Sequence, residues 1–249
     1  MNLITWNCNG ALRNKFASLD ALNADIFIIQ ECEDPQYHAQ YREWAGDYLW
    51  AGKSKNKGIG IFPKNGNRVT SLLWDGSFSI AGLSSVHAST HWTTSDLQLM
   101  LPFRINDALT VLAVWTKGSS KESFRYIGQL WKYLQIHRED LSGPKTLLMG
   151  DLNSNAIWDK PDRWWSHSGV VAELAQIGLQ SVYHHTKQEP QGKESVPTFF
   201  LHRDTDKPYH IDYAFASSDI LPECTLSIGD ASEWLSLSDH VPLVVTIKS

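Results

Sequence analysis

The sequence has few cysteines, no long apolar run and no excess of basic residues, and each shortage limits what the chain can be. The three cysteines, Cys8, Cys32 and Cys224, are odd in number and lack the spacing of a zinc site. We therefore expect free thiols in a reducing cytoplasm. No apolar run approaches the roughly 20 residues that span a bilayer, and no basic region followed by an apolar segment opens the chain. These absences predict a cytoplasmic protein with no membrane partner.

The chain also lacks a positive net charge, because it has 22 Lys and Arg and 27 Asp and Glu, which give a net charge of −5. This balance argues against a protein that coats DNA through a basic surface. It does not exclude an enzyme acting on nucleic acid, because a bound cation can offset a cluster of active-site carboxylates. The segment from Gly52 to Arg68 carries five basic residues and no acid. We interpret it as a loop leading into a strand, which either contacts a phosphate backbone or only aids solubility.

The chain also lacks any linker, internal repeat or low-complexity segment. Its length of 249 residues and its hydrophobic share of 42% suit one large α/β unit. We therefore predict a single catalytic domain over residues 1–249. No obligatory protein partner is evident, and we expect a monomer.

The hydrophobic pattern alternates between helices and a larger number of strands. Helices are predicted over 12–22 and over about 168–177, and Gly178 gives a stop signal after the latter. Another helix is predicted to begin near Ser119. Ser119 and Glu122 have the spacing of a capping box. Strands are predicted over 58–63, 78–86, 98–105 and 110–115. The excess of strands favours two packed sheets with helices outside.

The tetrapeptide Gly150-Asp151-Leu152-Asn153 follows an apolar run at 146–149 that reads as a buried strand. A two-residue offset at the end of a strand places the Asp151 and Asn153 side chains on the same face. Asp239 and His240 come just before another predicted strand at 241–247. A carboxylate, an amide and an Asp–His pair suit metal-assisted hydrolysis of a phosphodiester.

Three further polar residues lie in or beside predicted strands. Asn7 follows a strand at 3–6, and Glu31 ends a strand at 25–30. Asp212 lies at the centre of a predicted strand at 209–215, where an acid among apolar residues needs a partner. Taken singly, Asn7, Glu31 and Asp239 also fit ordinary turn or strand-end residues, so their joint occurrence carries the argument.

In this order and setting, the stretches TWNCNG, IIQE, GDLN, HIDYAF and SDHVP resemble the five motifs of the endonuclease/exonuclease/phosphatase superfamily. The resemblance extends from residue 3 to residue 247 and is strongest to exonuclease III and the abasic-site endonucleases. It implies a four-layer α/β sandwich, with two packed mixed sheets flanked by helices. It also implies hydrolysis of nucleic acid, with DNA as the expected partner, in a reaction that requires Mg²⁺ or Mn²⁺.

The chemistry and the resemblance together assign a role to each residue of the set. Glu31 is the first choice as metal ligand, with Asp239 and Asn7 as further contacts, because Mg²⁺ prefers hard oxygen ligands. Asp151 orients or deprotonates the attacking water, and Asn153 holds it in line. His240 contacts the scissile phosphate. Asp212 accepts the other ring N–H of His240 and fixes its tautomer.

Several residues are expected at the substrate rather than at the reacting atoms. His210 is two residues from Asp212, so it shares one face of the predicted strand with that acid. Lys57, Trp115 and Lys117 are the remaining candidates. Abasic-site endonucleases carry a tyrosine where this chain has Trp115, and an indole supplies no phenolic oxygen. Specificity for abasic sites is therefore not predicted.

Two other functions remain open from the sequence. The same superfamily includes phosphatases and phosphodiesterases that act on small molecules or lipid headgroups, and the acidic composition suits such a substrate. An inactive binding module on the same scaffold is the second alternative. The presence of the whole set from Glu31 to His240 argues against an inactive module.

Overall fold

The computed structural model describes residues 1–82, 90–97, 99–118, 124–163 and 165–248. Two six-stranded mixed sheets form its centre. The first sheet has the strand order β15 (Cys224–Ile228), β16 (Leu243–Ile247), β1 (Asn2–Asn7), β2 (Ile26–Cys32), β4 (Lys57–Pro63), β3 (Leu49–Ser54). The second has the order β11 (Leu179–Ser181), β14 (Asp212–Ser217), β10 (Thr146–Asp151), β9 (Leu109–Trp115), β8 (Met100–Ile105), β5 (Val69–Ser71).

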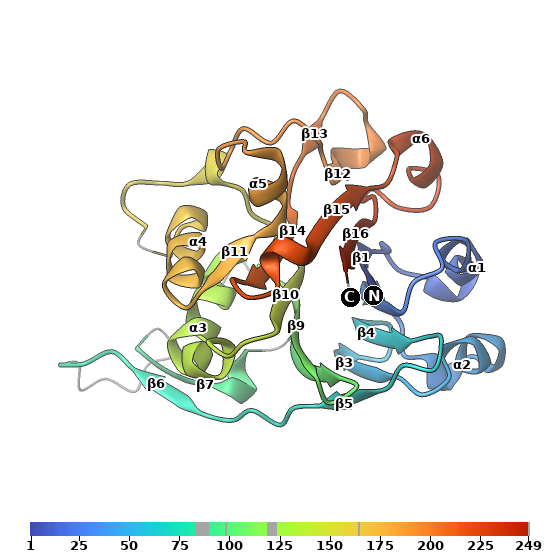
Figure 1. Cartoon of the computed structure of the whole chain (residues 1–249), viewed down its shortest axis with the longest axis horizontal. Coiled ribbons are helices and arrows are strands. Elements are labelled where there is room, and N and C mark those ends of the chain that lie inside the picture. Colours follow the sequence, from blue (N-terminus) through green and yellow to red (C-terminus); the bar gives the residue numbers. More distant parts are fainter. Residues whose placement is uncertain (83–89, 98, 119–123, 164, 249) are drawn as a thin grey trace.

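Helices cover the outer faces of both sheets, which gives a four-layer α/β sandwich (Figure 1). The helices α3 (Ile127–Leu141) and α4 (His167–Gln176) lie beside the second sheet, with α5 (Val182–Lys187) nearby. On the other side, α1 (Phe16–Asp20), α2 (Ala39–Ala45) and α6 (Ala231–Trp234) lie outside the first sheet. Two small ribbons complete the strands: β6 (Ser77–Ser79) with β7 (His91–Thr93), and β12 (Phe199–Phe200) with β13 (Pro208–Tyr209). The predicted fold class is confirmed.

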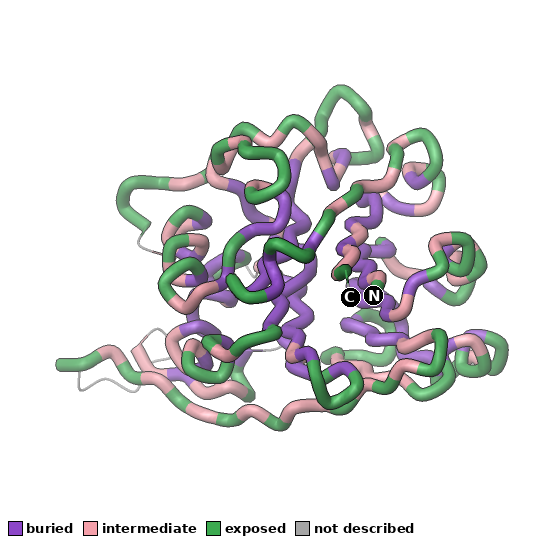
Figure 2. Tube along the Cα trace, in the orientation of Figure 1, coloured by how far each residue is buried: buried purple, intermediate pink, exposed green. Residues whose placement is uncertain are grey.

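The period-two alternation of the strands divides the core into three apolar layers. Leu147 and Met149 of β10 point into the space between the sheets, where they meet Ile28 of β2. Leu148 of the same strand points the other way and packs under α3 and α4. A third layer lies under α1 and α2. The buried residues in Figure 2 accordingly follow the sheets and the inner faces of the helices. Among the described residues, no helix combines the length and apolarity needed to cross a membrane.

Two predicted elements are interrupted in the structure. The helix predicted over 12–22 is a 3-10 turn (Leu12–Asn14) followed by α1, because Lys15 leaves the helical conformation with φ −129°. The strand predicted over 209–215 breaks at His210 and Ile211, so Asp212 begins β14 rather than lying at its centre. The predicted capping box of Ser119 and Glu122, and much of the strand predicted over 78–86, lie outside the described residues.

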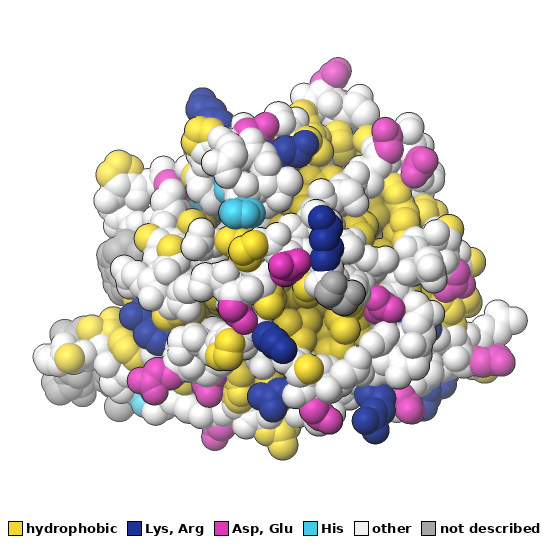
Figure 3. Space-filling model, viewed as in Figure 1, with side chains coloured by type: hydrophobic (Ala, Val, Ile, Leu, Met, Phe, Trp, Pro, Cys, Tyr) yellow, Lys and Arg dark blue, Asp and Glu magenta, His cyan; other side chains and the backbone are white. Residues whose placement is uncertain are grey.

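The basic segment from 52 to 68 differs most from its prediction. Residues 52–54 belong to β3, which turns directly into β4, so the segment is a hairpin rather than a loop. Its cations point in different directions: Lys55 lies over the Tyr37 ring and Lys64 over the Trp44 ring. The segment therefore does not form one continuous basic track. On the face shown in Figure 3, Lys and Arg side chains are likewise scattered among acidic ones.

Gly150 has a backbone position that no other residue can occupy without strain. Its φ is +149°, and a Cβ atom added there would lie 1.8 Å from the backbone oxygen of Val114 on β9. Gly150→Ala should lower the free energy of unfolding by about 3 kcal/mol or more, because β9 and β10 would have to separate. Urea unfolding measures this change. Gly66→Ala is the control, since Gly66 has φ +78° and no atom within 4 Å of the added Cβ. That control should lose about 1 kcal/mol, and equal losses for both variants would contradict the account.

Candidate active site

Asp151 lies at the end of β10 and is completely buried. Its Oδ2 atom accepts hydrogen bonds from the side-chain amides of Asn7, at 2.9 Å, and Asn153, at 2.8 Å. Its Oδ1 atom accepts the backbone N–H of Asn153 at 2.8 Å. Asn7 ends β1 of the first sheet, so this carboxylate joins the two sheets. Asn153 has φ +44°, a conformation that asparagine tolerates better than most residues, and this turn brings its amide back to Asp151.

Asp212 begins the neighbouring antiparallel strand and is the register partner of Asp151. Two acids opposite one another repel, and burial in a medium of low polarity makes that repulsion stronger. His240 supplies the compensating charge. Its Nδ1 atom lies 2.9 Å from Asp212 Oδ2, and its Nε2 atom lies 4.0 Å from Asp151 Oδ2. The three residues therefore form a buried acid–imidazole–acid arrangement.

The protonation of these groups follows from burial and from their mutual charges. Burial raises the pKa of Asp151, the neighbouring Asp212 charge raises it further, and His240 opposes both effects. Burial by itself lowers the pKa of His240, but the Asp212 and Asp151 carboxylates outweigh it and raise that pKa to about 9. His240 is therefore a cation at neutral pH, and a proton is held close to Asp151.

Glu31 lies beside this centre at an irregularity in β2. The pairing of β2 with β4 shifts register between Gln30 and Cys32, and Glu31 at the bulge has φ +62°. A bulge redirects a side chain, and here it places Glu31 Oε1 3.3 Å from the Asn7 amide. The other oxygen, Oε2, forms an ion pair with the ammonium group of Lys57 on β4. The Glu31 side chain is 18% exposed, so it lies at the mouth of the site rather than in the core.

Asp239 is held near Asn7 by its neighbour Ser238. The Ser238 hydroxyl donates to the backbone oxygen of Asn7 at 2.7 Å, and it accepts the backbone N–H of His240 at 3.1 Å. The Trp6 indole N–H donates to the backbone oxygen of His240 at 2.9 Å. These bonds attach the segment before β16 to the end of β1. The structure thus brings Asn7, Asp239 and His240 to the same end of the two sheets.

The donor atoms of the site fit a divalent cation. Asp151, Asp212 and His240 could each offer one ligand atom, and these atoms all lie within 4.8 Å of one another. The Glu31 carboxylate already neutralises a cation, the Lys57 ammonium group, and it adjoins the Asn7 amide. Carboxylate and amide oxygens of this kind suit Mg²⁺ and Mn²⁺.

The residues predicted at the substrate lie in different surroundings. His210 is 4% exposed, its Nδ1 atom lies 2.6 Å from the backbone oxygen of Val196, and its ring packs against Tyr183 and Tyr213. It offers substrate almost no accessible surface, because the break before β14 turns it inward. Trp115 is also buried, but it lines a cavity of about 490 Å³ together with the exposed side chain of Lys117 and with Lys57.

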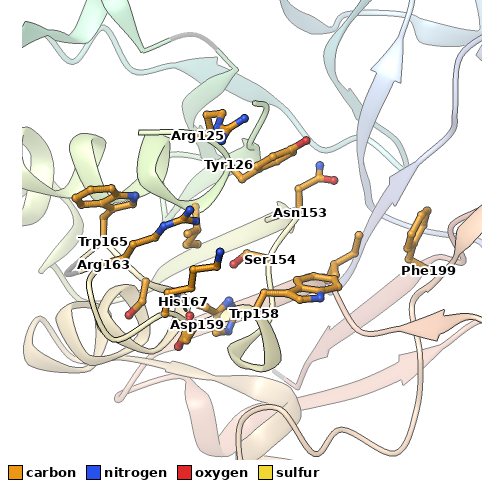
Figure 4. A pocket seen from close by; sticks show the side chains of 14 residues that line it. Arg125, Tyr126, Asn153, Ser154, Trp158, Asp159, Arg163, Trp165, His167 and Phe199 are labelled. Atoms are coloured by element: carbon orange, nitrogen blue, oxygen red, sulfur yellow. Dashed lines mark hydrogen bonds between the residues drawn. The ribbon is translucent and has the colours of Figure 1, made fainter. Parts of the chain in front are cut away.

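A second cavity, of about 450 Å³, contains residues that sequence reasoning missed. Its lining includes Arg125 and Tyr126, from the segment before α3, and Trp158 and Arg163, from the segment after Asn153 (Figure 4). Loop residues carry no periodic signal, and only the mixture of Lys, Arg and Trp over 158–165 distinguishes this stretch in the sequence. Cys8, next to Asn7, is buried and has a pKa raised to about 12 by that burial, so it is not a thiolate nucleophile.

Comparisons with known proteins agree with this geometry. The sequence profile described as the Endonuclease/Exonuclease/phosphatase family matches residues 4–240, so the chain belongs to that family and is a phosphoesterase of this class. No curated protein sequence matches the chain. Among solved structures, a variant of the 3′ phosphatase NExo from Neisseria, bound to a product DNA hairpin, is similar with a TM-score of 0.69 and 18% identity. Each chain is covered over 100% of its length.

Two further structures share the fold. An AP endonuclease from Archaeoglobus fulgidus has a TM-score of 0.66 and 16% identity, with 100% of both chains covered. The endonuclease domain of TRAS1, a telomere-specific non-LTR retrotransposon, has a TM-score of 0.62 and 16% identity. That comparison covers 100% of this chain and 98% of the other. These likenesses show the fold.

Glu194 lies in the loop between α5 and β12, and its hydrogen bonds hold that loop in place. The pKa of Glu194 allows this role to be tested. Burial alone would raise its pKa, but hydrogen bonds from His184, Asn155 and the Gly192 backbone N–H lower it to about 2. A carboxyl group whose pKa is lowered by folding stabilises the folded state at pH values above its ordinary pKa of about 4.5. This stabilisation is lost as the pH falls toward 2. Glu194→Gln should therefore lower the free energy of unfolding by about 1–3 kcal/mol at pH 7.

Urea unfolding of wild type and variant at several pH values measures this difference, which should shrink between about pH 4.5 and pH 2. Glu139→Gln, on the exposed surface of α3, is the matched control and should be close to neutral throughout. A Glu194 effect that stays constant as the solution is acidified would contradict the assignment.

Proposed function

We propose that this phosphoesterase is a metal-dependent nuclease that hydrolyses phosphodiester bonds of DNA. The observation that carries the proposal is the buried Asp151 carboxylate, fixed by Asn7 and Asn153 and facing the His240 imidazolium. This arrangement provides a proton acceptor and a positive charge a few ångströms apart. A phosphodiester needs both, because its charged oxygens repel a nucleophile.

Each residue then has one part in the reaction. Asp151 accepts a proton from a water molecule as the water oxygen bonds to phosphorus and the bond to the leaving oxygen breaks. Asn153, whose amide already bonds to Asp151, positions that water. The Nε2–H group of His240 stabilises the negative charge of the phosphoryl oxygens. Asp212 keeps the imidazole oriented through its bond to Nδ1.

We assign the metal to Glu31, with Asn7 and Asp239 as further contacts. When bound there, Mg²⁺ or Mn²⁺ would neutralise phosphate charge. The group of Asp151, Asp212 and His240 is the other possible metal site. We favour Glu31 because the buried group is already internally satisfied: Asp212 holds His240, and Asp151 holds two amides. The Glu31 side chain is 18% exposed, and Lys57 balances its charge.

The choice of DNA as the substrate rests on two proteins that share the fold. The NExo structure contains a DNA hairpin, and another similar structure is an AP endonuclease. The cations Lys57 and Lys117 line one cavity beside the centre, and Arg125 and Arg163 line the other. A polyanion crossing the site would meet positive charge in both.

The substrate and the metal can be tested in one assay. Purified protein with Mg²⁺ or Mn²⁺ is incubated with labelled duplex DNA, single-stranded DNA, DNA with an abasic site, RNA and inositol phosphates. We expect cleavage of DNA and complete loss of cleavage in EDTA. Glu31→Gln should raise the Mg²⁺ concentration needed for half-maximal rate by about tenfold or more, because it removes the ligand charge.

Three results would contradict the proposal. Turnover of inositol phosphates without cleavage of DNA would move the assignment to a small-molecule phosphoesterase. Cleavage that persists in EDTA would remove the metal. Glu31→Gln with the wild-type Mg²⁺ response would place the metal elsewhere, and the Asp151, Asp212 and His240 group would be the next candidate.

The residues of the chemical step make a separate prediction. Asp151→Asn and His240→Ala should each lower kcat by about two to four orders of magnitude, as for loss of a general base or a charge stabiliser. Steady-state kinetics on the cleaved DNA measures the change, and circular dichroism checks the fold. Asp107→Asn and His185→Ala, two exposed positions, are the matched controls. A folded Asp151 or His240 variant within a few-fold of wild type would be incompatible with the assigned roles.

A further inference from the structure

Two residues that line the cavity of about 450 Å³ described above also contact the catalytic centre. Asn153 lines it and donates to Asp151 at 2.8 Å. Phe199 lines another part, and its ring centroid lies 4.6 Å from that of His240. In Figure 4, Asn153 and Phe199 lie on the side of the cavity away from Trp165 and Arg163. A molecule in this cavity would therefore be the part of a substrate that adjoins the phosphate under attack.

Three exposed cations, Arg125, Lys160 and Arg163, line the same cavity. None of the three forms an ion pair with a carboxylate in the described part of the chain. Asp159, the acid among the residues that line the cavity, is occupied, since its two oxygens accept the backbone N–H groups of His167 and Ser168. In a chain with a net charge of −5, three cations around one cavity indicate an anionic ligand.

Exposed aromatic surface lines the cavity beside these cations. Trp158 is 46% exposed, and its ring centroid lies 5.3 Å from that of the neighbouring Tyr209. Tyr126 is 47% exposed, and its ring lies over Gly118, where a Cβ atom would come within 2.6 Å of it. Each ring thus has a neighbour against it while its residue is nearly half exposed, which suits stacking of a planar group.

We propose that this cavity binds the nucleotide next to the scissile phosphate in an unstacked form, with its base on Trp158 and its further phosphate on Arg125, Lys160 and Arg163. The inference rests on the proposed nuclease function and specifies the substrate as a strand whose bases are free to leave a duplex. An inositol phosphate or a lipid headgroup would use the cations but would have no planar group for the aromatic rings. The volume lies within the range of sites for small ligands.

Binding without cleavage tests the cavity independently of catalysis. The probe is a fluorescently labelled single-stranded DNA oligonucleotide, and anisotropy is measured in EDTA over a range of salt concentrations. A second probe of equal length is a deoxyribose-phosphate chain without bases. The variants are Trp158→Ala, Trp158→Phe, and the triple variant Arg125→Ala, Lys160→Ala and Arg163→Ala. The control triple variant Arg68→Ala, Arg104→Ala and Lys145→Ala removes the same number of Arg and Lys side chains from exposed positions outside the cavity.

Trp158→Ala should weaken binding of the DNA probe by about tenfold and leave the base-free probe unaffected, because stacking on one aromatic ring contributes about that much. Trp158→Phe should recover most of the loss. The cavity triple variant should weaken binding of both probes and reduce the log–log salt slope by about 0.7 for each phosphate that the protein no longer neutralises. The control triple variant should change the slope less than the cavity triple variant does.

Equal binding by the cavity and control triple variants would overturn the proposal, as would a Trp158→Ala loss of the same size on both probes. Wild-type protein that fails to bind the DNA probe would overturn it as well. The outcome is separable from the nuclease assignment. If the protein binds as described but cleaves no DNA, the proposed role of the cavity stands and the nuclease assignment fails. If the protein cleaves DNA but the variants leave binding unaffected, the nuclease assignment stands and the proposed role of the cavity fails.

Discussion

Two buried carboxylates placed opposite each other on adjacent strands are the constraint on which the rest of this site depends. Asp151 and Asp212 are register partners of β10 and β14 and have 0% and 1% exposure. Their repulsion in a medium of low polarity is tolerable only with a cation and hydrogen-bond donors in contact. His240 supplies the cation, and Asn7 supplies one of the donors. Both of these residues belong to the other sheet or to the segment leading into it.

The packing of the two sheets therefore positions the residues of the site. The buried charges of the site in turn destabilise that packing. β1 and β2 lie against β10 across the interface, and this contact brings Asn7 to Asp151. Gly150 allows β9 and β10 to approach closely just before the acid. A cluster of charges held in this way stores unfavourable energy, as active sites commonly do, and the surrounding apolar layers offset it.

The excess of strands predicted two packed sheets, the resemblance in five motifs implied the four-layer sandwich, and the structure has this fold. It also brings Asn7, Asp151 and His240 together, as the sequence led us to expect. Apolar runs of strand length located β1, β2 and β10, and polar residues at their ends located Asn7, Glu31 and Asp151. The bulge that redirects Glu31 and the strand break that buries His210 depend on pairing with distant segments, so no local pattern indicates them. Arg125, Tyr126 and Arg163 around the second cavity lie in loops and escaped prediction for the same reason.

The charge balance of the buried group is tested most directly by a double-mutant cycle on the free energy of unfolding. His240→Gln removes the cation, and Asp151→Asn removes one acid while keeping the shape. The account predicts that His240→Gln destabilises wild type by about 3 kcal/mol or more, because two buried acids are then uncompensated. In the Asp151→Asn background the same change should cost at least about 1 kcal/mol less. Additive losses, within about 0.5 kcal/mol, would show that the two residues do not interact and would contradict the account.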